Sequence, residues 1–117
     1  MAKTKVKNLK IVQGSHYEHE FFYTDSSGDA IPLTGYSARC QFRAAIEEAT
    51  PFFDVTDSDP ELSINEAAGK VTLIVLAATS AAFTNYKGVH DIEIESPAGI
   101  PTRIVKGKVD IDREVTR

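Results

Sequence analysis

The chain has 117 residues, close to the commonest size of a single domain, and its 42% hydrophobic and 26% charged residues exclude a disordered protein. The formal net charge of −4 argues against nucleic-acid binding by the body of the protein, and the single cysteine, Cys40, excludes a disulfide within the chain. No apolar run is long enough to cross a membrane and the N-terminus lacks the apolar core of a signal peptide, so we expect synthesis and folding in a cytoplasm.

The N-terminal segment is basic. Four lysines and no acidic residue stand among the first ten residues, namely Lys3, Lys5, Lys7 and Lys10. They fit either a nucleic-acid-binding arm or the outward face of an edge strand over Val6–Gln13, where lysine discourages unwanted pairing. The absence of arginine or aromatic partners favours the edge strand. We therefore divide the chain into a basic arm or edge strand over residues 1–14 and one domain over residues 15–117.

Alternating residues predict two strands in the first half of the domain. One covers His16–Thr24, and it ends at Asp25–Asp29, a cluster of turn-forming residues around Gly28. The next covers Gly35–Arg43, in which apolar and polar side chains alternate strictly. A strand places successive side chains on opposite faces, so this segment has one buried and one solvated face.

The second half of the chain continues the pattern. Phe52–Thr56 and Lys70–Leu76 are short β-prone runs, and Ala77–Tyr86 suits one helical turn that Thr79 or Ser80 would cap. Gly88–Ile111 predicts a hairpin of two strands around a turn at Pro97–Gly99. Seven to eight short strands joined by turns predict an all-β antiparallel sandwich.

The buried faces of these strands define the expected core. Its members are Phe21, Tyr36, Ala38, Cys40, Phe42, Leu73, Ile92, Ile94 and Val109. Cys40 is expected to behave there as a small buried hydrophobe.

Few residues have the spacing of a chemical site. His16 and His19 would point to opposite faces of a strand, and a zinc site needs three or four converging ligands. Asp57 and Asp59 resemble the start of a calcium loop but lack its later ligands, while Asp25 and Asp29 are explained by a hairpin tip as well as by calcium. We therefore expect no catalytic residue, no metal and no cofactor.

The order of the segments carries a family resemblance. The matching segments are 22–39, Gly69–Leu73, Ser80–Tyr86, Asp91–Gly99, Thr102–Val109 and Glu114–Arg117. Together they resemble small phage and prophage structural proteins, in particular the N-terminal immunoglobulin-like domain of siphophage upper-baseplate proteins. The resemblance covers most of the chain from about residue 15 onward, and it implies an immunoglobulin-like fold.

The resemblance implies a non-enzymatic virion component. Such a protein is made in the bacterial host cytoplasm and acts as an adaptor in the tail, baseplate or fibre-attachment region, as a homo-oligomer in several copies on a symmetric particle. Its partners would be other virion proteins, not nucleic acid or a membrane. A capsid decoration protein and a small glycan-binding adhesin module are the alternatives. The sequence contains one such domain, so it would either connect a fibre or fill or decorate a joint.

Contacts with partners are expected on the loops at one end of the sandwich and on the two termini, because loops carry recognition while strand faces are committed to packing. The candidate contact residues are Lys3, Lys5, Lys7, Lys10, Asp25, Gly28, Asp29, Pro97, Gly99, Pro101 and Arg117.

Overall fold

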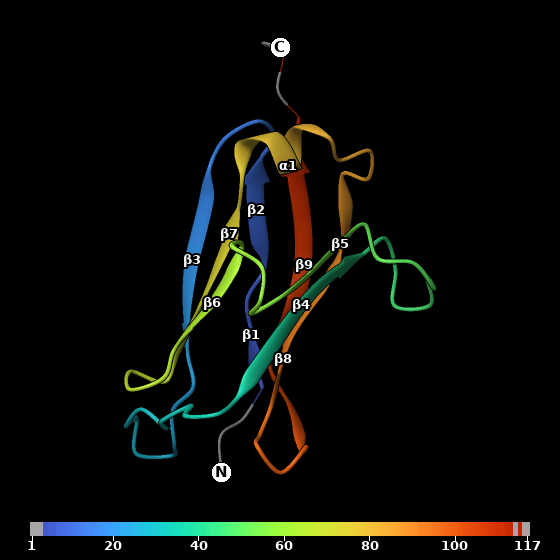
Figure 1. The fold of residues 1–117 in the computed structure, drawn as a ribbon. Coiled ribbons are helices and arrows are strands. Elements are labelled where there is room, and N and C mark those ends of the chain that lie inside the picture. Colours follow the sequence, from blue (N-terminus) through green and yellow to red (C-terminus); the bar gives the residue numbers. More distant parts are fainter. Residues whose placement is uncertain (1–3, 114, 116–117) are drawn as a thin grey trace.

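Two β-sheets packed face to face form the computed structural model of the chain, which describes residues 4–113 and 115 (Figure 1). The larger sheet has the order β1-β9-β8-β4-β5, with β2 also paired to β9, and the smaller sheet has the order β3-β7-β6. The strands are β1 Lys5–Val6, β2 Leu9–Val12, β3 Tyr17–Phe22, β4 Ser37–Arg43, β5 Phe53–Thr56, β6 Leu62–Asn65, β7 Lys70–Val75, β8 Lys87–Glu95 and β9 Pro101–Asp112.

This strand order is that of an immunoglobulin-like sandwich. The smaller sheet corresponds to strands B, E and D of that fold, and β9-β8-β4-β5 corresponds to strands G, F, C and C′. The prediction of an all-β sandwich with one helical turn is confirmed. One pairing departs from the antiparallel expectation, because β1 and β2 both run parallel to β9. β1 and β2 are far from β9 in the sequence, and no hairpin connects them to it. Only a hairpin would require the paired strands to run antiparallel.

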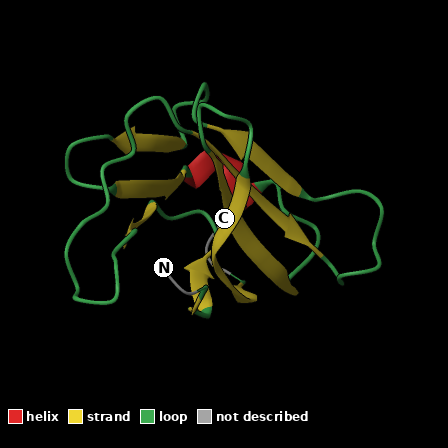
Figure 2. Cartoon of the chain, turned by 90° about the horizontal axis from the view of Figure 1, so that it is seen from below, coloured by secondary structure: helices red, strands yellow, loops and turns green. Residues whose placement is uncertain are grey.

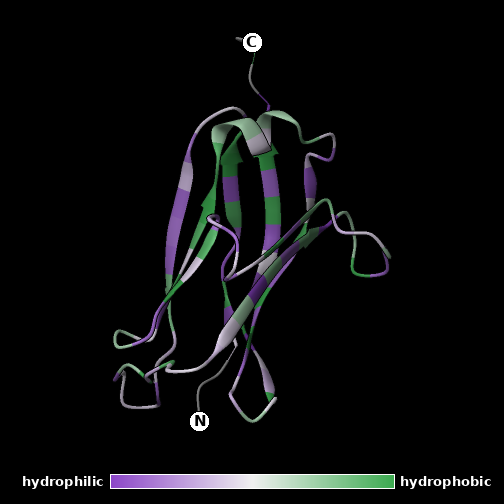
Figure 3. Ribbon diagram, viewed as in Figure 1, coloured by the Kyte–Doolittle hydropathy of each residue, from purple (hydrophilic) through white to green (hydrophobic). Residues whose placement is uncertain are grey.

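Alternation along β4 and β8 builds the centre of the core. Cys40 and Phe42 of β4 are fully buried, and their partners on β8 include Ile92 opposite Cys40. Ile92 and Ile94 are likewise fully buried, while Glu93 between them faces solvent. Figure 3 shows the same alternation of hydrophobic and hydrophilic residues along β2 and β9. Burial also raises the pKa of the Cys40 thiol, so this cysteine stays an uncharged packing residue.

Most of the expected core is confirmed, with one exception. Tyr36 precedes β4 and is only partly buried, because it lies in the β3–β4 connection, where the backbone amide of Tyr36 bonds the Leu33 carbonyl in a turn. Leu33 takes the interior position instead and is fully buried.

The helical turn α1, Ala77–Ala81, joins β7 to the segment before β8. Neither Thr79 nor Ser80 caps it, since the helix begins after Leu76 without a side-chain cap. Ser80 is fully buried, and its hydroxyl accepts a hydrogen bond from the Gly14 amide at 2.9 Å and donates one to the Ala77 carbonyl at 3.3 Å. The serine therefore ties α1 to the β2–β3 connection, a tertiary role that local sequence does not reveal.

Candidate protein-contact surface

The two loops with candidate contact residues lie at the same end of the sandwich. In Figures 1 and 2 the β3–β4 connection, the β8–β9 hairpin and the start of β1 gather at one end, which Figure 2 views from below. The β3–β4 connection and the β8–β9 hairpin approach each other at Gly35, where a Cβ atom would lie 2.8 Å from the Pro97 ring. We refer to Asp25–Asp29 and Pro97–Pro101 together as the loop end.

Asp25 is the residue that shapes its turn. Its Oδ1 accepts hydrogen bonds from the backbone amides of Ser27 at 2.9 Å and Asp29 at 3.0 Å, and Gly28 adopts a φ of 86° that favours glycine. The hairpin-tip interpretation therefore accounts for the Asp25 carboxylate, and Asp29 remains exposed at the tip.

The β8–β9 turn is equally well fixed. The Ser96 amide bonds the Ile100 carbonyl at 3.0 Å, the Gly99 amide bonds the Ser96 carbonyl at 2.8 Å, and Gly99 has a φ of 82°. Pro101 begins β9 opposite Glu95. Ile100, which sequence reasoning did not single out, is 62% exposed between them. The loop end therefore presents an aliphatic side chain on a backbone held by its own hydrogen bonds.

The described lysines of the N-terminal segment extend from the loop end along one sheet edge. Lys5, Lys7 and Lys10 are all exposed, and the ammonium of Lys5 donates to the Phe22 carbonyl at 3.0 Å. Lys10 lies opposite Asp110 of β9. The candidates Lys3 and Arg117 lie outside the described residues. The structure thus places both candidate loops at one end of the sandwich and spreads the described lysines along the edge strands.

A kink at Lys7–Asn8 separates β1 from β2. The side-chain Oδ1 of Asn8 accepts from the Lys108 amide at 3.0 Å, and the Lys7 carbonyl accepts instead from Nε2 of His90 at 2.6 Å. Gly107, the pairing partner of His90, leaves the space for this carbonyl, since a Cβ at Gly107 would overlap the Lys7 oxygen. Asn8, His90 and Gly107 together allow the edge strand to continue past the kink.

His90 is nearly fully buried, and its bond to Lys7 identifies Nε2 as the protonated nitrogen. The other ring nitrogen, Nδ1, is buried without a partner among the described residues. Burial lowers the pKa of His90 below its ordinary value of 6.5, which the Lys7 bond and the Asp91 carboxylate only partly offset. Phe42, whose ring centre lies 6.1 Å away, offers nothing to stabilise a second proton.

This burial predicts an acid-sensitive stability. The folded protein resists protonation of His90, while the unfolded chain accepts it. The free energy of unfolding therefore has its full value above pH 6.5 and falls as pH drops below that value. Urea denaturation between about pH 7 and pH 5 measures the slope. We expect His90→Gln, which keeps a donor for the Lys7 carbonyl and removes the titrating ring, to flatten it. An equally steep slope in the variant would contradict this role.

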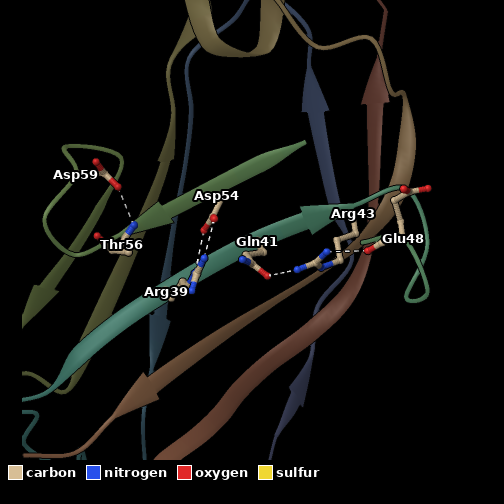
Figure 4. Close-up of polar contacts among 7 residues, drawn as sticks. All are labelled: Arg39, Gln41, Arg43, Glu48, Asp54, Thr56 and Asp59. Carbon is tan, nitrogen blue, oxygen red and sulfur yellow. Dashed lines mark hydrogen bonds and ion pairs between the residues drawn. The ribbon is translucent and has the colours of Figure 1, made fainter. Parts of the chain in front are cut away.

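Polar contacts on the outer face of β4 and β5 organise the neighbouring loop (Figure 4). Arg39 donates two hydrogen bonds to the Asp54 carboxylate, at 3.0 and 2.8 Å, and these lower the pKa of Asp54. Arg43 donates to the Gln41 side chain at 2.9 Å and to the Glu48 carbonyl at 2.7 Å. Arg39 thus forms an ion pair with a carboxylate, whereas Arg43 bonds a backbone carbonyl of the β4–β5 loop and an uncharged side chain.

A groove lies beside these contacts, on the outer face of the larger sheet. It has a volume of about 390 Å³ and is lined by residues of β1, β4, β8, β9 and the β4–β5 loop. Four cationic side chains surround it, namely Arg43, Arg103, Lys106 and Lys108. The sequence analysis did not predict this site. The outward positions of Arg43, Lys106 and Lys108 follow from alternation, but every such residue was interpreted as part of the solvated surface.

Among residues 4–113 and 115, no three histidine, cysteine, aspartate or glutamate side chains converge as metal ligands. In the same part of the chain, no helix is both long and apolar enough to cross a membrane.

Comparison with known proteins identified no relative: no family model matches the sequence, and no curated protein matches it significantly.

Proposed function

We propose that the protein is a non-enzymatic structural component of a phage virion, an adaptor in the tail, baseplate or fibre-attachment region that acts through multivalent contacts with other virion proteins. The observation that carries the proposal is the agreement between the segment order that resembles phage structural proteins and the immunoglobulin-like strand order of the sandwich. A fold of this kind hosts many functions, so the resemblance supplies the functional part of the argument.

The loop end is the proposed docking surface. Its two turns are fixed by internal hydrogen bonds, so little conformational entropy is lost when a partner binds. The exposed Ile100 supplies apolar area next to polar backbone. Several copies on a symmetric particle would make individually weak contacts hold through effective concentration.

A bulky substitution at the loop end tests this surface. Ala98, exposed in the β8–β9 turn, is replaced by arginine, and Ser58→Arg in the exposed β5–β6 turn serves as the matched control. The variants complement a gene deletion, and their copy number in purified particles is measured by quantitative mass spectrometry. We expect Ala98→Arg to lower incorporation several-fold and Ser58→Arg to leave it unchanged. Equal incorporation of the two variants would exclude the loop end as the contact.

A further inference from the structure

We propose that the groove on the outer face of the larger sheet binds an acidic, aliphatic peptide segment of a partner protein. The proposal deepens the adaptor function, on which it rests for the identity of the partner as another virion protein. We call this site the basic groove. Its lining includes Val6, Ile46, Val89, Asp91 and the four cations Arg43, Arg103, Lys106 and Lys108.

Charge is the first argument. The four cations face a single carboxylate, Asp91, so the lining carries a formal balance of +3 with His90 neutral, in a chain whose net charge is −4. None of the four takes part in an ion pair within the described part of the chain. Arg39, on the same face of β4, is by contrast neutralised by Asp54. Asp91 lies opposite Lys106 and Glu93 lies opposite Arg103 in the β8–β9 pairing, but the lining keeps a net positive charge, which attracts an acidic partner.

The apolar lining supplies the second argument. Val6 is 70% exposed and Ile46 is 82% exposed, so neither aliphatic side chain packs in the core of the protein. With Val89 they give the basic groove an aliphatic lining that contains no phenylalanine, tyrosine or tryptophan. Nucleobases and sugars are usually held by stacking on such rings, so an aliphatic side chain is the better occupant.

The form of the partner follows from these dimensions. A volume of about 390 Å³ is at the small end of ligand pockets and accommodates one or two side chains. In an extended peptide, every second residue faces the same side, about 6.6 Å apart. A peptide in which acidic and aliphatic residues alternate at every second position therefore places an aliphatic side chain in the groove and directs the carboxylates two residues away toward its cationic rim.

Fluorescence anisotropy with three labelled peptides tests the proposal on the purified protein. The first carries glutamate and leucine in turn at every second position, so that both face the same side, and the other two carry glutamine or lysine in place of the glutamates. We expect the glutamate peptide to bind most tightly at low salt and to weaken as salt is added. Lys106→Glu combined with Lys108→Glu should reduce its affinity by about tenfold or more. Lys87→Glu, which reverses an exposed cation of β8 outside the groove, should leave it unchanged.

A second variant separates binding from folding. Ile46→Asp alters a loop residue too exposed to support the core, and it should weaken binding of the glutamate peptide while the circular dichroism spectrum stays unchanged. The proposal would be overturned if the three peptides bound equally or if the glutamate peptide did not bind. It would also be overturned if the Lys106 and Lys108 variant kept its binding, or if a single-stranded DNA oligonucleotide bound more tightly than the peptide. Absence of the protein from virions would instead overturn the adaptor function and leave the peptide titration unaffected.

Discussion

Replacing Ile92 with aspartate is expected to unfold the protein. Ile92 is fully buried at the centre of the larger sheet, opposite Cys40 on β4 and Val105 on β9. The described buried residues include no lysine or arginine that could pair with a carboxylate there, and the loss of packing adds to the cost of burying it. The penalty is on the order of 4 kcal/mol or more, against a total stability of about 5–15 kcal/mol for a domain of this size.

The measurement is the soluble yield and the far-ultraviolet circular dichroism spectrum of the variant. Ile92→Val provides a readable companion, and its urea midpoint should correspond to a loss of about 0.5–1.5 kcal/mol. Glu93→Ala, one residue along β8 on the exposed face, should change stability by less than about 0.5 kcal/mol. A folded and soluble Ile92→Asp protein would show that β8 does not have the register described here.

A methyl group added at Gly107 is expected to cause the second largest loss. The Cβ of Gly107→Ala would overlap the Lys7 carbonyl and approach Asn8 Oδ1 at 3.1 Å. Relief requires β1 to move away from β9, which would also stretch the bond from His90 to Lys7. Overpacking of this kind costs about 1–3 kcal/mol.

Urea denaturation measures the loss, and hydrogen exchange shows where it arises. The Lys7 amide, which bonds the Lys106 carbonyl at 2.9 Å, should exchange faster in Gly107→Ala, while the amides of the β4–β8 pairing stay protected. Lys108→Ala, at the next and exposed position, should be nearly neutral. A Gly107→Ala protein as stable as the original would remove the physical reason given for this glycine.

Strands with strict alternation were predictable from the sequence. Gly35–Arg43 and Gly88–Ile111 have one apolar face each, and the structure forms β4, β8 and β9 there with those faces inward. The exception is in β9, where Ile104 and Val105 are both buried next to a shift in the pairing with β8. Alternation also predicted which side chains face solvent. These predictions succeed because the side-chain period of a strand is a local property of the backbone.

The N-terminal segment shows where such reasoning ends. Its lysines indicated an exposed edge strand, and β1 and β2 do lie at the sheet edge, but Leu9 and Ile11 between the exposed residues are almost fully buried. The kink at Lys7 depends on His90, which is 83 residues away in the chain, and on Gly107, which is still further along it. No local pattern records a contact of that separation.

The basic groove was invisible for the same reason. Its cations come from β4 and β9, and its aliphatic residues come from β1, β8 and the β4–β5 loop. Each residue taken alone is an ordinary surface residue. Only the strand order β1-β9-β8-β4 makes them neighbours.

Mass spectrometry of virions purified from the host that carries this gene tests the adaptor proposal most directly. The adaptor proposal predicts that the protein is found in intact particles in a fixed, multiple copy number relative to the tail proteins. Deletion of the gene should then yield particles with a defective tail, baseplate or fibre attachment. Absence of the protein from the particles, together with normal particle assembly after the deletion, would contradict a structural role in the virion.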